Sequence, residues 1–247
     1  MKNSYKIKDF MPMGYAGQCS LTCMVWIINY FYDTFFWSKD MFDLSAVVKF
    51  GKWQFGDVLN IYEIALFLER SYFDITLFSG MIRSDWEYIL HGLDKKKMVD
   101  IYKKYMNPIL HKYIDWTTWH FEEWDTMEMV DLDLQSKLAN SDVKFIYELM
   151  DKDLLQSIKS NQDIENWTTL FLLWLNYNIL HNISDHDDKP AGHMVLTTGL
   201  DQDNNFIIYE PIRPRPNPIL IPQQTVLKAI HFMEPYEILM VKNNLSY

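Results

Sequence analysis

The last third of the chain has the pattern of an antiparallel sheet. Residues 167–175 are apolar apart from two threonines, which is typical of a strand that is covered on both faces. Two shorter apolar segments follow at 194–199 and 206–209, and the turn-forming sequence Asp-Gln-Asp-Asn-Asn separates them. Two short strands joined by such a turn predict a hairpin. The earlier segments must therefore pack around a sheet that forms late in the sequence.

The chain leaves the predicted hairpin through a proline-rich segment. Residues 211–222 exclude a regular helix and a central strand, because proline lacks the backbone N–H that both require. Residues 223–230 then predict a short helix, and residues 236–242 predict a closing strand.

The first third of the chain predicts helices. A buried helix is expected from Cys19 to about residue 36, with Ser20 as a suitable cap. Its apolar positions follow the i, i+3, i+4, i+7 spacing of a helix: Leu21, Met24, Val25, Ile28 and Phe31. A second helix is predicted over residues 57–69, capped by Asp57, and a short strand over residues 74–78.

The middle of the chain, residues 85–161, is acidic, aromatic and helical in pattern, and it has no internal repeat. We interpret it as a helical insertion within a single domain that covers residues 1–247. Its tryptophans are expected in the core rather than on a ligand platform: Trp86, Trp116, Trp119 and Trp124. Helices followed by a late antiparallel sheet predict an α+β fold.

The composition excludes several classes of protein. The net charge is −10, whereas nucleic-acid binding needs a basic face, and only residues 95–97 are locally basic. The two cysteines, Cys19 and Cys23, are too few for a disulfide scaffold. No further cysteine or histidine lies near enough in the sequence for a zinc knuckle, so we expect no metal and no cofactor.

The apolar segments are too short or too interrupted to cross a membrane. Asparagine and aspartate interrupt residues 23–37, and two asparagines fall within residues 170–180. Residues 1–10 are charged and lack the apolar core of a signal peptide. We therefore expect a cytoplasmic protein without a membrane span, although export as an effector stays open.

A thiol at the start of a buried helix is a candidate nucleophile. The partial positive charge of the helix N-terminus stabilises a thiolate, and a neighbouring histidinium lowers the thiol pKa further. Free N–H groups in the first turn can also face a developing oxyanion. His193, at the entry to the hairpin, can serve as the base for Cys19, and Glu210, at the end of the next strand, can orient it.

Three segments resemble the bacteriocin-leader (double-glycine) peptidases, which are papain-like cysteine peptidases. Residues 18–27, Gln-Cys-Ser-Leu-Thr-Cys-Met-Val-Trp-Ile, are similar to the segment around that family's nucleophile. Residues 192–201, Gly-His-Met-Val-Leu-Thr-Thr-Gly-Leu-Asp, resemble its histidine hairpin, and residues 206–211 resemble the strand that ends in Asn-Asp-Pro. The resemblance covers roughly residues 8–80 and 165–243, and the layout is also similar to that of eukaryotic guanylyl-cyclase-domain proteins.

This resemblance implies a papain-like fold in which Cys19 is the nucleophile, His193 the base and Glu210 the orienting group. Glu210 stands where the family has aspartate, and Ser20 replaces a glycine. The family's oxyanion-hole glutamine lies about six residues before the cysteine, where this chain has Met13. Gln18 and Ser20 are the nearest residues that could support the oxyanion in its place.

Cys23 is the competing nucleophile. A shift of the alignment by one helical turn would put Gln18 five residues upstream of it. We prefer Cys19, because the Cys-x3-Cys register matches the peptidase pattern and leaves Cys23 on the helix interior.

These residues predict a cysteine hydrolase that attacks a peptide or protein substrate and forms an acyl-enzyme. An acyltransferase could use the same cysteine and histidine. Because the upstream glutamine is missing, a catalytically weakened papain-like scaffold that binds a protein partner is the alternative from another class. The substrate and the oligomeric state stay open.

Two other polar clusters are interpreted as solvated surface. The first could instead bind a metal or form a substrate rim beside His193: His181, Asp185, His186, Asp187 and Asp188. The second is more scattered: His111, His120, Glu122, Glu123 and Asp125.

Overall fold

The structure is a computed structural model. It describes residues 19–32, 61–92, 94–105, 108, 132–148, 151–162, 168–183, 191–211, 218–232 and 237–243. Within these ranges, the helices are α1 (Cys19–Tyr32), α3 (Ile61–Arg70), α4 (Arg83–His91), α5 (Lys95–Tyr105), α7 (Leu132–Ala139), α8 (Asp151–Asn161), α9 (Tyr177–Leu180) and α10 (Gln223–Phe232). The strands are β1 (Phe73–Ser79), β2 (Lys144–Ile146), β3 (Thr169–Asn176), β4 (Gly192–Leu200), β5 (Asn205–Tyr209), β6 (Ile219–Pro222) and β7 (Glu237–Asn243).

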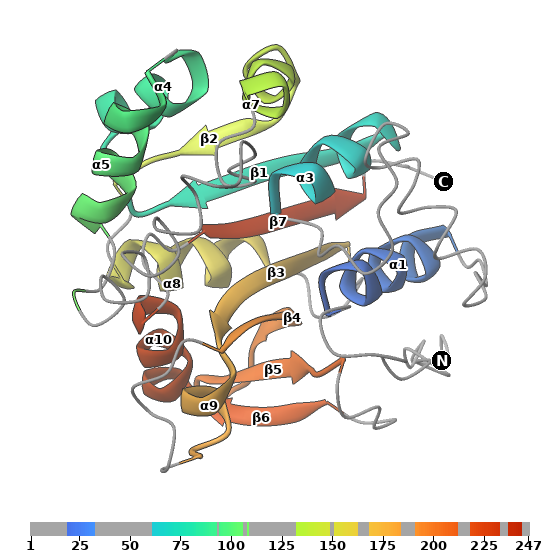
Figure 1. The fold of residues 1–247 in the computed structure, drawn as a ribbon. Coiled ribbons are helices and arrows are strands. Elements are labelled where there is room, and N and C mark those ends of the chain that lie inside the picture. The colour runs from blue at the N-terminus through green and yellow to red at the C-terminus, as the bar shows by residue number, and fades with distance from the viewer. Residues whose placement is uncertain are drawn as a thin grey trace.

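One seven-stranded sheet organises the described residues, with the order β2-β1-β7-β3-β4-β5-β6 (Figure 1). The β1–β2 pair is parallel, and the other described pairs are antiparallel. The predicted hairpin is present as β4 and β5. The described part of the proline-rich segment contains β6, at the edge of the sheet, where Pro222 does not interrupt a central ladder. The predicted closing strand, β7, lies between β1 and β3 and joins the early strand to the late ones.

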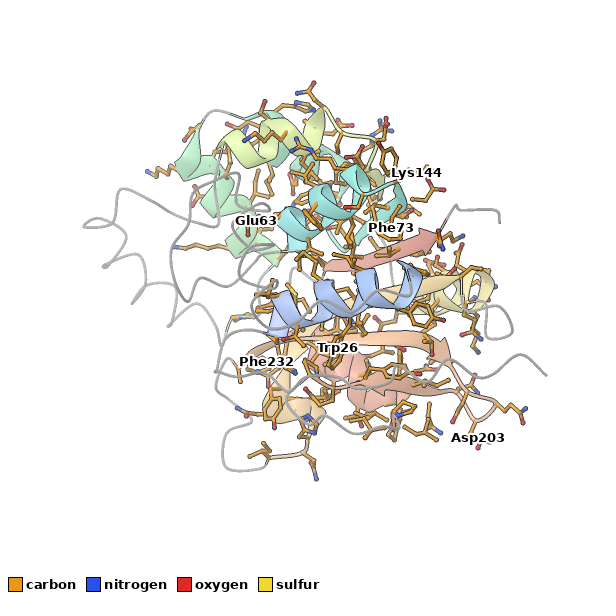
Figure 2. All side chains as sticks on the ribbon, turned by 90° about the vertical axis from the view of Figure 1, so that its right-hand side faces the viewer. Trp26, Glu63, Phe73, Lys144, Asp203 and Phe232 are labelled. Carbon is orange, nitrogen blue, oxygen red and sulfur yellow. The ribbon has the colours of Figure 1, made fainter. Side chains whose placement is uncertain are left out.

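Helices cover both faces of the sheet, and the fold is α+β because the described strand pairs are antiparallel apart from β1–β2. Along β3, Leu170 and Leu172 belong to the core that contains α1 and α3. Phe171 and Leu173 belong to the opposite core, with α8 and α10. Side chains of a strand alternate between its faces, so the continuous apolar run in β3 serves two hydrophobic cores at once. Figure 2 shows α1 lying across one face of the sheet, and the buried Trp26 belongs to the core on this face.

Helices α8, α9 and α10 pack on the face of the sheet opposite α1 and α3. The prediction of a helical insertion over residues 85–161 was wrong in one respect, because β2 lies within these residues and pairs in parallel with β1. β2 has only three residues, too few for strand periodicity to show in the sequence. Trp86 is fully buried as expected, whereas Trp116, Trp119 and Trp124 lie outside the described residues.

The other predicted elements are found close to their expected bounds. The first helix begins at Cys19, and α3, β1, β3 and α10 correspond to the remaining predictions for these parts of the chain. The proposed cap Asp57 lies outside the described residues. None of the helices in the described ranges combines the length and apolar character needed for a bilayer crossing.

A buried carboxyl group lies in the core at the start of β7. Glu237 faces the core of α1 and α3, and the Tyr62 hydroxyl donates a hydrogen bond to its Oε1. Burial raises the pKa of Glu237 from 4.5 to about 8, although the hydrogen bond from Tyr62 acts in the opposite direction. The side chain is therefore protonated in the folded protein at neutral pH and ionised in the unfolded chain.

We predict that Glu237→Gln makes stability less dependent on pH. A raised folded-state pKa means that the folded protein holds a proton that the unfolded chain releases, so this contribution is present below pH 4.5 and is lost as pH rises to about 8. The amide does not titrate. The free energy of unfolding of Glu237→Gln, relative to the wild type, should increase by roughly 3 kcal/mol between pH 5 and pH 8. Urea unfolding at both pH values measures this, and a constant difference would contradict it.

Candidate active site

The thiol of Cys19 lies at the N-terminus of α1, where the helix meets β4. The first N–H groups of a helix have no partner within it and carry partial positive charge. The backbone N–H of Ser20 hydrogen-bonds to the Cys19 sulfur, and so does the backbone N–H of Met194 in β4. Cys19 is 4% exposed, so the sulfur sits where the helix packs on the sheet.

The hairpin brings His193 and Glu210 together. Leu196 of β4 pairs with Tyr209 of β5, and continuing this register by one residue puts Glu210 opposite Val195. Glu210 is then the diagonal neighbour of His193 on the same face of the sheet, a separation that long side chains can bridge. His193 Nε2 lies 2.6 Å from Glu210 Oε1, and both side chains are buried.

Cys19 and His193 form a hydrogen-bonded pair. The Nε2 atom of His193 contacts Glu210, so Nδ1 is the ring nitrogen that can contact the sulfur of Cys19. Burial raises the pKa of the Cys19 thiol, but the hydrogen bond and the positive charge of His193 outweigh it, so the net pKa is lowered. Burial also disfavours the imidazolium, yet Cys19 and Glu210 together raise the pKa of His193 to about 9. The pair is therefore stabilised as thiolate and imidazolium.

Glu210 has a second histidine partner, which lies in a segment whose sequence pattern indicates a solvated loop. His181 follows α9, and its Nε2 lies 2.8 Å from Glu210 Oε2, with the His181 side chain 8% exposed. The ring of Tyr177 contacts both imidazoles, with centroid distances of 4.4 Å to His181 and 5.3 Å to His193. The sequence signal for His181 was only its place shortly after a buried strand, and α9 has too few residues to be recognised from periodicity.

Cys23 is in a different environment from Cys19. It lies one turn further along α1, is fully buried, and its Sγ–H donates to the carbonyl oxygen of Met194 at 3.5 Å. Burial raises the pKa of Cys23 well above its ordinary value, and the charges of Cys19 and Glu210 act in the same direction. Of the two thiols, the structure puts Cys19 beside the histidine.

Of the two residues predicted to support an oxyanion, the structure describes one. Ser20 is fully buried, and its hydroxyl has no hydrogen-bond partner within the described part of the chain. Gln18 and Met13 lie outside the described residues. The same holds for the remaining members of the two polar clusters: His111, His120, Glu122, Glu123, Asp125, Asp185, His186, Asp187 and Asp188. Across the residues that the structure describes, no group of three His, Cys, Asp or Glu side chains could hold a metal ion.

Two comparisons with known proteins do not assign the chain to a family. No model of a protein family matches the chain, and no curated protein is significantly similar to it in sequence.

We predict that a small alkylating reagent labels Cys19 selectively. Both thiols are buried, so the difference in rate reports mainly the fraction of thiolate. Iodoacetamide at pH 6–7 should modify Cys19 in the folded protein and modify Cys23 only after denaturation. Peptide mapping by mass spectrometry measures both sites, and Cys23→Ala is the control that should label at the wild-type rate. Equal labelling of the two sites, seen only in denaturant, would contradict the prediction.

Proposed function

We propose that this protein is a papain-like cysteine hydrolase that cleaves a peptide or amide bond through Cys19, His193 and Glu210. The observation that carries the proposal is the buried arrangement of Cys19, His193 and Glu210 at the start of α1, with the carboxylate of Glu210 2.6 Å from the ring of His193. The order of the elements also supports it, with the nucleophile on an early helix and the base and acid on a late hairpin.

The proposed reaction has two steps. The Cys19 thiolate attacks the carbonyl carbon of the substrate, and the C–N bond breaks as the His193 imidazolium gives its proton to the leaving amine. A water molecule then attacks the thioester, with His193 taking the water's proton. The carboxylic acid leaves, and the thiolate–imidazolium pair is restored. Backbone N–H groups of the first turn of α1 are the donors available to the oxyanion.

The buried charges favour an enzyme over a silent scaffold. Taking a thiolate, an imidazolium and a carboxylate out of water costs several kcal/mol per ion before their attraction offsets it. A scaffold that only binds a partner gains nothing from this arrangement, whereas a nucleophile and base require it. Perturbed pKa values combined with the geometry of a nucleophile, a base and an orienting acid are typical of catalytic sites.

Three variants test the proposal against a synthetic peptide library, with cleavage products identified by mass spectrometry. Cys19→Ala should abolish cleavage, and Glu210→Gln should lower kcat by about 10²–10⁴-fold because the neutral amide no longer stabilises the imidazolium. Cys23→Ala is the matched control and should retain activity. New amide products formed with added amines would identify acyl transfer in place of hydrolysis.

Cleavage that persists in Cys19→Ala would refute the proposal. So would a wild-type protein that neither cleaves the library nor reacts at Cys19 with peptide vinyl sulfones.

We predict that the acylation rate falls as pH rises through about 9. The productive state has Cys19 deprotonated and His193 protonated, and the leaving amine needs the proton of His193, whose pKa is about 9. Alkylation of Cys19 needs only the thiolate and should persist above this pH. Rates of peptide cleavage and of iodoacetamide labelling, both measured from pH 5 to pH 10, should therefore diverge near pH 9. Parallel profiles at high pH would contradict this.

A further inference from the structure

The proposed reaction uses one oxygen of Glu210, yet both oxygens have an imidazole partner. Oε1 is 2.6 Å from His193 Nε2, and Oε2 is 2.8 Å from His181 Nε2. Because a carboxylate only accepts hydrogen bonds, each histidine donates to it from Nε2. The side chains are almost completely buried, with 3% exposure for His193, 8% for His181 and 2% for Glu210.

A glutamate in this position needs to be held in place. Its side chain has one more rotatable bond than aspartate, and ordering such a chain costs conformational entropy. A buried carboxylate that loses a hydrogen bond also bears a desolvation cost, which rotation away from His193 could relieve. The hydrogen bond from His181 to Oε2 removes this cost and fixes the plane of the carboxylate, so that Oε1 stays directed at His193.

His181 is itself anchored to the base of the hairpin. The side chain of Asn176 caps α9 by accepting a hydrogen bond from the Ile179 N–H at 3.1 Å. The Tyr177 N–H donates to the carbonyl oxygen of Ala191 at 2.8 Å, immediately before β4 begins. These contacts tie α9 to the strand that carries His193. The ring of Tyr177 then packs against both imidazoles and sets their relative position.

We propose that His181 is a positioning residue of the active site, which holds Glu210 through Oε2 so that Oε1 stays hydrogen-bonded to His193 Nε2. The inference rests on the proposed function for its role in turnover, but its effect on His193 and Cys19 can be measured without a substrate.

The test compares His181→Phe, which keeps an aromatic ring but removes the donor, with His181→Gln, which keeps an N–H within reach of Glu210. The pKa of His193 is measured by NMR on protein with ¹⁵N-labelled histidine, and the pH profile of Cys19 alkylation is measured on the same samples. His181→Phe should lower the His193 pKa by about one unit or more and move Cys19 alkylation to higher pH. In His181→Gln, the His193 pKa and the pH profile of Cys19 alkylation should both lie close to those of the wild type.

The chain offers a matched control in His231, whose Nε2 hydrogen-bonds to Asp151 between α10 and α8, away from this site. His231→Phe also removes a histidine–carboxylate contact, but it should leave the His193 pKa and the alkylation profile unchanged. If a substrate is found, His181→Phe should lower kcat about 10-fold or more with little change in KM, because the proposed role is to orient the base.

An unchanged His193 pKa and an unchanged alkylation profile in His181→Phe would overturn the inference. If His181→Phe does not fold, the ¹⁵N NMR spectrum of the wild-type histidines tests the inference instead. The inference requires that His181 carries a proton on Nε2, so a neutral ring protonated on Nδ1 alone would refute it. A shifted His193 pKa in a protein that cleaves no peptide would uphold the inference while refuting the proposed function.

Discussion

The contact between Cys19 and His193 is the interaction on which the arrangement of the chain depends. It joins the first residue of an early helix to a strand from the last quarter of the sequence. The sulfur can meet the ring only if α1 lies across the sheet with its first turn at the start of β4. The apolar character of α1 enforces this packing, because Met24, Ile27 and Phe31 are all buried in the core shared with the sheet. The same burial removes water from the site, which strengthens the attraction between thiolate and imidazolium.

The sheet topology brings the remaining groups to the same place. β3 ends where β4 begins, since Leu175 pairs with His193, and β5 ends one strand further along. Residues that leave or enter strands at this end of the sheet therefore converge from separate parts of the sequence. His181 follows β3, His193 begins β4 and Glu210 follows β5. The β4–β5 turn, which includes Asp203 in Figure 2, lies at the opposite end of the hairpin.

The sequence predicted those features that depend on local patterns. Helical spacing and polar turns located α1, β4 and β5, and these elements alone put Cys19, His193 and Glu210 in order along the chain. Features that depend on long-range packing could not be predicted from the sequence. The parallel pairing of β2 needs the strand β1 as a template, and Glu237 looks like an ordinary surface acid until β7 is inserted between β1 and β3. His181 was missed for the same reason, because its significance comes only from the carboxylate that it contacts.

The balance of charge explains why several groups must converge on this small buried volume. A thiolate and a carboxylate carry two negative charges, and the imidazolium of His193 neutralises only one of them. The remainder is stabilised by further hydrogen-bond donors and by the dipole of α1. The N-terminus of α1 contributes roughly half a positive charge, and the N–H groups of Ser20 and Met194 point at the sulfur. On the carboxylate side, the N–H of His181 supplies the corresponding donor. Removing any one of these donors leaves a buried anion with fewer partners, and His193, which lies between Cys19 and Glu210, responds to a change on either side.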